Sequence, residues 1–321
     1  MKWILVFVVG FIAGLVITYF PSSKTEKLPV AEVEEIQPLL KYTIENLGMR
    51  EYQSEIVMDE IAATEAAFFV QKFHFDSDGK NVSGLAHIPN SCDKCPTIVQ
   101  FRGYADPTIY QSGYGTWRSA QEFAKAGFIS LAPDFLGYGE SASPSADVFE
   151  ARFETYTTAL NLLVGVEKWE KSNGKVGIWG HSNGGQIALT ILEISQKEYP
   201  TVLWAPVTAG FPYSILFYMN DNEEGDKNLR KKLVDFESIY DTGLFNLLNY
   251  VERIKAQLQL HQGTGDVSVP VGWNRGFAKK IPGIVYFEYS GADHNLQPGW
   301  NLVVERDIDF FRKNLFNPVS P

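Results

Sequence analysis

The residues with the clearest chemical pattern lie in a glycine-rich segment, residues 180–185, which reads Gly-His-Ser-Asn-Gly-Gly. Where Gly-x-Ser-x-Gly joins an apolar strand to a helix, the serine occupies a sharp turn, and small neighbours leave room for its strained backbone. A hydroxyl held at a helix N-terminus suits nucleophilic attack, because the helix dipole stabilises developing negative charge. We therefore predict that Ser182 is a nucleophile, the alternative being an ordinary helix N-cap serine.

A serine nucleophile needs a general base to take its proton, and the chain has five histidines. His294 lies in the segment Ser-Gly-Ala-Asp-His-Asn of residues 290–295, directly after an expected strand. This position fits the chain order serine, acid, histidine. The other four are expected in a hairpin, beside the serine or inside a strand, where packing is their ordinary role: His74, His87, His181 and His261. We therefore predict that His294 is the base.

An acid that orients the base is expected between the nucleophile and the histidine. Residues 262–270 read Gln-Gly-Thr-Gly-Asp-Val-Ser-Val-Pro and follow an expected strand, with glycines on both sides of Thr264 to allow a turn. Asp266 of this segment would hold the imidazole in one tautomer and stabilise the imidazolium. Asp293 is the rival, but its adjacency to His294 makes a side-chain bridge awkward. We predict that Asp266 is the orienting acid.

Two backbone donors are expected to bind the oxyanion of the reaction intermediate. The first is the N–H of Asn183, the residue after the nucleophile. The second comes from residues 101–107, Phe-Arg-Gly-Tyr-Ala-Asp-Pro, which follow an expected strand. Gly103 permits close approach of the backbone, and the N–H of Tyr104 is the candidate donor. An ordinary strand-to-helix turn is the alternative interpretation.

The elements that must position these residues alternate along the chain. Hydrophobic patterning predicts strands at 67–75, 82–88, 97–101, 128–132, 175–179, 202–204, 257–262 and 284–289. It predicts helices at 117–126, 149–169, 186–196, 273–280 and 303–311. A two-stranded entry followed by alternating strands and helices predicts an α/β fold with a mostly parallel sheet and helices on both faces. Such sheets bind ligands at the carboxyl ends of their strands, where the candidate residues fall.

A long insertion separates two of the expected core strands. Residues 208–250 are too long for a simple connection, so we expect them to form a partly helical lid over the pocket. Five aromatic residues of the insertion could line an apolar substrate site or simply pack the lid: Phe211, Tyr213, Phe217, Tyr218 and Phe245. The acidic run at 220–224 could meet a substrate ammonium group or form a solvated face.

The two cysteines, Cys92 and Cys95, form a lone Cys-x-x-Cys in a loop before a strand. A zinc site would need two further ligands, and a redox motif would be expected at the start of a helix. Outside the cytoplasm, a small local disulfide is the favoured interpretation. We therefore predict neither a metal nor an organic cofactor.

Composition limits the class of partner. The chain has 321 residues, of which 45% are hydrophobic and 21% are charged, as is typical of a packed globular protein. The 28 Lys and Arg residues are outnumbered by 38 Asp and Glu residues, which gives a net charge of −10. This acidic balance argues against a nucleic-acid partner.

The N-terminal segment predicts a membrane anchor. Residues 3–20 carry no charge, and as a helix they would be about 27 Å long, close to the thickness of a bilayer core. Trp3 and Tyr19 lie at its two ends, where aromatic rings favour the interface, and Lys2 favours a cytoplasmic N-terminus. We predict a single-pass transmembrane signal anchor over residues 1–21, with the rest of the chain extracytoplasmic. A cleaved signal peptide is the alternative, but no small-x-small cleavage site follows.

The rest of the chain is divided by composition. Residues 22–50 are polar and contain Pro29 and Pro38, so we predict a tether and lead-in over residues 22–66. Residues 67–321 are predicted to be one catalytic domain, whose lid spans about 208–250.

Five motifs together resemble a known superfamily. They are residues 180–185, 133–141 (Pro-Asp-Phe-Leu-Gly-Tyr-Gly-Glu-Ser), 205–208 (Ala-Pro-Val-Thr), 263–270 and 291–294 (Gly-Ala-Asp-His). Residues 67–316 resemble an α/β-hydrolase catalytic domain, most closely the prolyl oligopeptidase (S9) group and its dienelactone-hydrolase-like relatives. The resemblance implies an α/β-hydrolase fold and a serine hydrolase that forms an acyl-enzyme, with a Ser182, Asp266 and His294 triad. Together with the anchor predicted at residues 1–21, this predicts a membrane-anchored serine hydrolase.

The resemblance implies a serine-type peptidase acting on short peptides. The alternatives are a carboxylesterase or dienelactone-hydrolase-like esterase acting on a small ester, and a non-catalytic binding protein on the same scaffold. The chain departs from the S9 pattern in two ways. Its first 66 residues cannot hold the β-propeller of prolyl oligopeptidases, and Arg102-Gly103-Tyr104 replaces a frequent His-Gly-Gly. Because a tyrosine hydroxyl is one oxyanion donor in prolyl oligopeptidases, the resemblance leaves open whether Tyr104 acts through its side chain or its backbone.

Overall fold

The computed structural model describes residues 37–220 and 222–316, and within these a nine-stranded sheet has the order β1-β2-β3-β5-β4-β6-β7-β8-β9. Its strands are β1 (Val57–Thr64), β2 (Phe68–Ser77), β3 (Lys80–Pro89), β4 (Cys95–Phe101), β5 (Ile129–Pro133), β6 (Ser172–His181), β7 (Thr201–Trp204), β8 (Leu258–Gly263) and β9 (Val285–Tyr289). The six strands from β5 to β9 in this order are parallel, whereas β1, β2 and β3 pair antiparallel. The predicted mostly parallel sheet is therefore confirmed.

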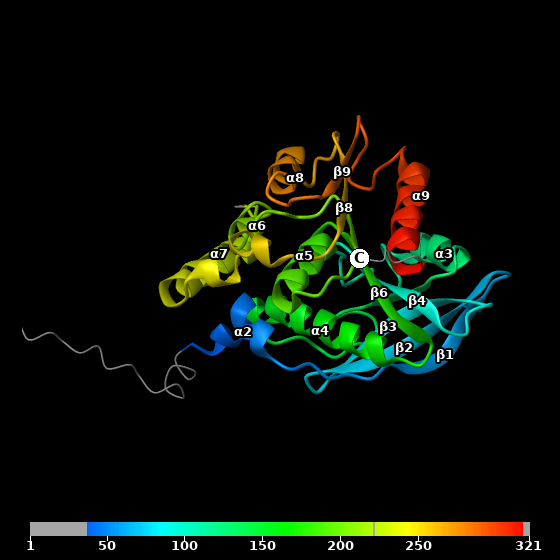
Figure 1. Ribbon diagram of the computed structural model, residues 1–321. Coiled ribbons are helices and arrows are strands. Elements are labelled where there is room, and N and C mark those ends of the chain that lie inside the picture. Colours follow the sequence, from blue (N-terminus) through cyan, green and yellow to red (C-terminus); the bar gives the residue numbers. More distant parts are fainter. Residues whose placement is uncertain (1–36, 221, 317–321) are drawn as a thin grey trace, which may run out of the picture. The chain divides into compact units, whose positions relative to one another are not determined.

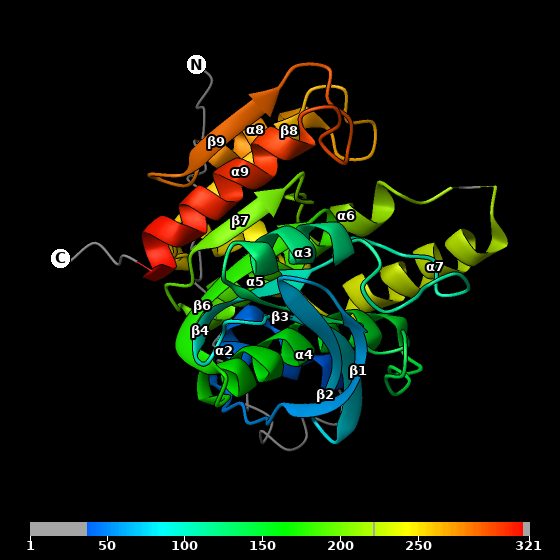
Figure 2. The ribbon, with the colours of Figure 1, turned by 90° about the vertical axis from the view of Figure 1, so that its right-hand side faces the viewer.

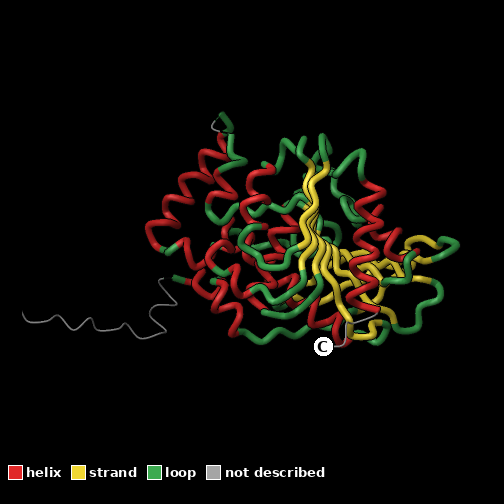
Figure 3. Tube along the Cα trace, turned by 45° about the horizontal axis from the view of Figure 1, so that its top comes forward, coloured by secondary structure: helices red, strands yellow, loops and turns green. Residues whose placement is uncertain are grey.

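Helices cover both faces of the sheet (Figures 1 and 2). The helices are α2 (Ile44–Met49), α3 (Trp117–Lys125), α4 (Val148–Lys168), α5 (Asn183–Ser195), α6 (Tyr213–Leu216), α7 (Glu224–Ile239), α8 (Val271–Ala278) and α9 (Trp300–Phe311). Short helical turns add η1 (Pro38–Tyr42), η2 (Thr242–Phe245), η3 (Leu247–Asn249), η4 (Val251–Arg253) and the π-turn η5 (Arg312–Phe316). Helices α3 and α9 lie on one face, and α4 and α5 lie on the other. Figure 3 shows the strands running between these two helical layers.

Each face of the sheet buries its own apolar cluster. On the α4 and α5 face, Phe153, Leu162 and Leu189 belong to one large cluster with residues from β2 to β8. On the other face, Phe311 of α9 and Trp179 of β6 belong to a second cluster. Because the central strands are buried on both faces, they read as continuous apolar runs, which is why the sequence predicted them closely.

The lead-in contributes to the sheet more than the sequence predicted. Residues 39–66 belong to the same compact unit as the rest of the described domain, and β1 pairs antiparallel with β2. The anchor predicted for residues 1–21 lies outside the described residues and stays a prediction. Among the residues that the structure does describe, no helix has both the length and the apolar character needed to cross a bilayer.

The insertion between β7 and β8 contains α6, α7 and the turns η2 to η4. Phe211 and Phe245 from it are buried against Phe153 of α4 and Phe236 of α7, with ring centroids between 4.8 and 6.2 Å apart. These two aromatic residues therefore pack the insertion onto the domain, as the second of the two interpretations expected.

The two cysteines form the predicted local bond. Cys92 and Cys95 are joined by a disulfide in the loop that leads into β4. This loop lies at the end of the sheet opposite the carboxyl ends of the parallel strands, because Cys95 begins β4.

A buried carboxyl group on α5 is expected to limit stability. Glu193 is 0% exposed, and neither of its carboxyl oxygens has a hydrogen-bond partner among the described residues. Nε of Arg253 donates to the backbone carbonyl of Glu193 (2.8 Å) rather than to its side chain. Burial raises the pKa of Glu193 well above its ordinary value, and the charge of Glu252 adds to this effect.

Replacing Glu193 with Met is expected to raise the free energy of unfolding by about 1–3 kcal/mol near pH 7, the range for burying an uncompensated polar group. The folded chain keeps the proton on Glu193 to a higher pH than the unfolded chain. The stability of the wild type therefore falls as pH rises above the ordinary carboxyl pKa, and Glu193→Met removes this fall.

Urea unfolding at pH 4 and pH 7 measures both effects, and the gain from Glu193→Met should be smaller at pH 4. The exposed Glu198, just beyond the end of α5, provides the matched control Glu198→Met, for which little change is expected. A Glu193→Met protein that is no more stable than the wild type at pH 7 would refute this reading of Glu193.

Candidate active site

Ser182 lies at the sharp turn between β6 and α5 that the sequence predicted. Its backbone has φ 55° and ψ −120°, a region that residues with a side chain rarely adopt. A Cβ on Gly184 would collide with the carbonyl of Phe101, and one on Gly180 would lie 2.7 Å from the carbonyl oxygen of Gly184. Only glycine therefore fits at these two positions, and the turn holds the half-buried Ser182 at the N-terminus of α5.

His294 and Asp266 are paired in the structure. Nδ1 of His294 donates to Oδ2 of Asp266 at 2.8 Å, because an ionised carboxylate can only accept. The Asp266 side chain is 0% exposed and that of His294 is 21% exposed. This hydrogen bond fixes the tautomer of His294, so that Nε2 carries the free lone pair.

The Asp266 carboxylate is held by several donors. Oδ1 accepts the backbone N–H groups of Ser268 (2.8 Å) and Val269 (2.9 Å), and Oδ2 also accepts Nε2–H of Gln262 (3.2 Å). Burial is the largest single influence on the pKa of Asp266 and acts to raise it. The hydrogen bonds and the nearby His294 outweigh burial, and the net pKa lies below the ordinary value. Asp266 is therefore ionised at neutral pH.

Two other histidines also contact a carboxylate, but neither lines the pocket that Ser182 faces. Nδ1 of His74 lies 2.9 Å from Asp59 in the β1–β2 pair. His261 is completely buried, which confirms its predicted packing role. Nε2 of His261 lies 3.0 Å from Asp307, which is also fully buried.

His181 holds the loop that carries His294. Its Nε2–H donates to the backbone carbonyl of His294 at 3.0 Å, and the two rings lie 4.7 Å apart. Burial lowers the pKa of His181 to about 4, and the neighbouring His294 adds to this shift. His181 is therefore neutral at physiological pH. The sequence treated His181 only as a neighbour of Ser182 and did not foresee this contact.

The predicted oxyanion loop passes beside Ser182. A Cβ on Gly103 would lie 3.0 Å from Cβ of Ser182. No described residue accepts the backbone N–H of Asn183 or that of Tyr104. The Tyr104 side chain is 77% exposed. Asn183 follows the nucleophile directly, Tyr104 lines the same cavity, and neither backbone N–H has an acceptor within the described chain.

Arg102 of this loop contacts the segment 133–141, one of the five motifs of the resemblance. Arg102 donates through Nη1 to the carbonyl of Gly103 (2.9 Å) and through Nη2 to that of Asp134 (3.0 Å). Its guanidinium lies 4.6 Å from the ring centroid of Tyr110 and 4.0 Å from that of Tyr138. Arg102 thus ties the oxyanion loop to the loop that follows β5.

A cavity of about 890 Å³ contains these groups. Ser182, His181, His294, Gly103 and Asn183 all line it. Tyr218 and part of α6 line the cavity from the insertion. Of the five aromatic residues predicted to line a substrate site, Tyr218 alone lines this cavity in the described chain. Tyr213 and Phe217 instead contact Trp273 of α8 at centroid distances of 5.8 and 4.6 Å. The acidic run contributes Glu223 to the cavity.

Arg152 of α4 also lines this cavity, and the sequence did not single it out. It lies three residues after Phe149 and one before Phe153, on the apolar face of the predicted helix. A cation on an apolar helix face is the signal that could have found it.

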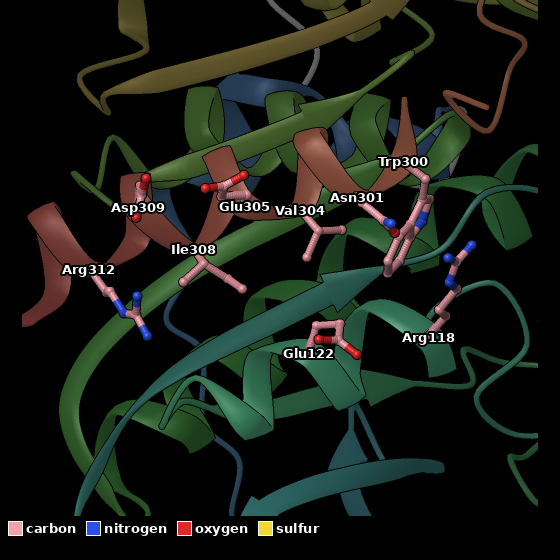
Figure 4. A pocket seen from close by; sticks show the side chains of 9 residues that line it. All are labelled: Arg118, Glu122, Trp300, Asn301, Val304, Glu305, Ile308, Asp309 and Arg312. Atoms are coloured by element: carbon pink, nitrogen blue, oxygen red, sulfur yellow. The ribbon is translucent and has the colours of Figure 1, made fainter. Parts of the chain in front are cut away.

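A second hollow, of about 530 Å³, lies between α3 and α9. Figure 4 shows the side chains that line it, with Arg118 beside Trp300. The guanidinium carbon of Arg118 is 3.4 Å from the ring centroid of Trp300. None of the nine described residues that line this hollow is a serine, cysteine or histidine, so it lacks the residue types that meet in the cavity of Ser182.

Comparisons with known proteins agree with this architecture. A family model for the alpha/beta hydrolase fold matches residues 96–199, which run from β4 to the end of α5 and include Ser182. The comparison with curated protein sequences gave no significant match.

Three solved structures, two of them acetyl xylan esterases by title, are similar to the chain. Acetyl xylan esterase 1 from Thermoanaerobacterium sp. JW/SL YS485 has a TM-score of 0.65 at 15% identity, covering 88% of this chain and 99% of that one. Acetyl xylan esterase from Paenibacillus sp. R4 has a TM-score of 0.66 at 16% identity with the same coverage. Est1E from Butyrivibrio proteoclasticus, solved with ferulic acid bound, has a TM-score of 0.56 at 16% identity, covering 73% of this chain and 96% of that one.

The protein has the alpha/beta hydrolase fold, as the family model and the structural matches agree. This confirms the fold that the resemblance implied, while the closer resemblance to the S9 group stays a prediction. Three features of the chain form its candidate site: the strand order, the strained serine between β6 and α5, and the histidine loop after β9.

Proposed function

We propose that this protein is a serine hydrolase of carboxylic esters that works through an acyl-enzyme. The observation that carries the proposal is the strained Ser182 facing the same cavity as a His294 already bound to Asp266. In this proposal Ser182 Oγ attacks the ester carbonyl carbon while His294 Nε2 takes the hydroxyl proton. The alkoxide then leaves with that proton, and a water activated by His294 hydrolyses the acyl-enzyme.

The remaining roles follow from the geometry of the cavity. The backbone N–H groups of Asn183 and Tyr104 would bind the oxyanion, helped by the N-terminus of α5. Asp266 would keep His294 in the tautomer that accepts a proton and would stabilise the imidazolium. His181 would hold the His294 loop through its hydrogen bond to the backbone carbonyl.

Esters are favoured over peptides because two of the structurally similar proteins named above are acetyl xylan esterases by title, and the third, Est1E, has ferulic acid bound. The peptidase activity predicted from the S9 resemblance lacks support of this kind and is not part of the proposal. The predicted membrane anchor at residues 1–21 remains compatible with it.

A substrate panel tests the proposal. We expect the protein to hydrolyse short 4-nitrophenyl esters at least a hundredfold faster, in kcat/KM, than aminoacyl 4-nitroanilides. Efficient turnover of the anilides would overturn the ester assignment in favour of a peptidase. Turnover of neither class would favour the binding protein on a hydrolase scaffold.

A further inference from the structure

We propose that Arg152 makes the active-site cavity selective for substrates that carry a carboxylate, an inference that rests on the ester hydrolase function proposed above. Arg152 extends from α4 into the cavity that Ser182 and His294 line. Its Nη2 donates to Oε1 of Gln186 at 2.6 Å and to Oγ of Ser214 at 3.4 Å. Both acceptors are neutral.

The guanidinium is fixed close to the nucleophile. Gln186 lies on α5 four residues after Ser182, about one helical turn along the same axis. Its side chain is 2% exposed, and its Nε2 donates to the carbonyl of Ala209 at 2.9 Å, which turns the amide oxygen toward Arg152. The buried amide therefore holds the guanidinium in the cavity that Ser182 and His294 line.

The positive charge of Arg152 has no counter-ion in the described chain. No Asp or Glu side chain there forms an ion pair with it, and its Nε is buried without a hydrogen-bond partner. Partly burying a cation among neutral partners is unfavourable, and proteins normally pair such a group. A carboxylate from a ligand would supply the missing partner, and the planar fork of arginine matches it in two hydrogen bonds.

The other charged groups of the cavity are committed elsewhere. Arg102 also has a buried Nε without a partner, but its Nη1 and Nη2 donate to two backbone carbonyls and its guanidinium lies against two tyrosine rings. Asp226 accepts the backbone N–H of Asn220 (2.6 Å), and Glu223 accepts the Asn220 side-chain amide (3.1 Å). These two acidic groups of the insertion would repel an anion nearby, so the carboxylate is expected at Arg152.

Apolar side chains from α4 and from the insertion also line the cavity around Arg152. Val148, Phe149, Ile215 and Leu229 line the same cavity. A substrate that suits this surface has an aliphatic spacer of a few carbons between the ester and the carboxylate. The inferred substrate class is therefore an ester that bears a carboxylate at the end of a short apolar chain.

Two matched pairs of esters test the inference. In the first, the acyl group carries the charge: the 4-nitrophenyl monoester of adipic acid is compared with its methyl-capped diester. In the second, the alcohol carries it: the acetate of 6-hydroxyhexanoic acid is compared with the acetate of its methyl ester. We expect the wild type to prefer the free carboxylate in at least one pair. In that pair, Arg152→Gln should lower the preference by about ten- to a hundredfold, the range for a hydrogen bond to a charged group.

Two further variants make the result specific. Arg118→Gln removes the same charge at the hollow between α3 and α9, and it should leave the preference as in the wild type. Arg152→Lys keeps the charge without the fork and should keep a reduced preference; it also replaces Arg152→Gln if that variant does not fold. Turnover of all four esters without preference for the carboxylate, or an equal loss for both members of each pair in Arg152→Gln, would overturn the inference. Failure to hydrolyse any ester would instead overturn the proposed function.

Discussion

Replacing Ser182 with Ala is expected to lower kcat for 4-nitrophenyl esters by about 10⁴- to 10⁶-fold. The residual activity would come from substrate binding and from the oxyanion donors alone. The reason is that Ser182 supplies the attacking oxygen, and water in the cavity would have to replace it without the strained turn that presents the hydroxyl. Steady-state and single-turnover kinetics at neutral pH measure the effect.

Ser195 provides the matched control for this change. It lies at the other end of α5, where its Oγ accepts the backbone N–H of Lys197 at 3.3 Å. Ser195→Ala should keep kcat within about threefold of the wild type, and circular dichroism should show both variants folded. A folded Ser182→Ala protein with near-wild-type turnover would refute nucleophilic catalysis by Ser182.

Replacing Asp266 with Asn is expected to lower kcat by about 10³- to 10⁴-fold with little change in the fold. Because the backbone N–H groups of Ser268 and Val269 both point at Oδ1, the amide oxygen of Asn must take that position. The amide NH₂ then faces Nδ1 of His294. His294 can meet that donor only with an unprotonated Nδ1, so its proton moves to Nε2, which can no longer accept the proton of Ser182.

Asp293, the rival acid from the sequence, separates a specific effect from a general one. Its Oδ1 accepts the backbone N–H groups of Asn295 and Gln297, both at 2.9 Å. Asp293→Asn should therefore lower kcat by less than tenfold. If Asp293→Asn proves as damaging as Asp266→Asn, the assignment of Asp266 as the orienting acid is wrong.

The sequence predicted the arrangement around Ser182 well because its elements are set by local rules. Central parallel strands are buried on both faces, so they appear as apolar runs, and glycine at 184 is required by the carbonyl of Phe101 beside it. The carboxyl ends of parallel strands meet at one edge, and this explains why Asp266 and His294, 28 residues apart, could be predicted to meet.

The rest depended on tertiary contacts that leave a weak pattern. Strand β1 lies at the edge of the sheet with most of its residues at least partly exposed, so it has no apolar alternation to detect. Helix α7 buries only Leu233 and Phe236 in the structure, too few to define a face. The hydrogen bond from His181 to the His294 loop joins segments 113 residues apart and could not be read from either one.

Labelling with a fluorophosphonate probe tests the central claim most directly. In the expected reaction, Ser182 Oγ attacks phosphorus, fluoride leaves, and His294 takes the hydroxyl proton, so the adduct reports both the nucleophile and its base. Intact-mass and peptide mass spectrometry should find one adduct, on Ser182, that is absent from Ser182→Ala and formed much more slowly by Asp266→Asn. No adduct on the wild type, or an adduct that persists in Ser182→Ala, would contradict the account.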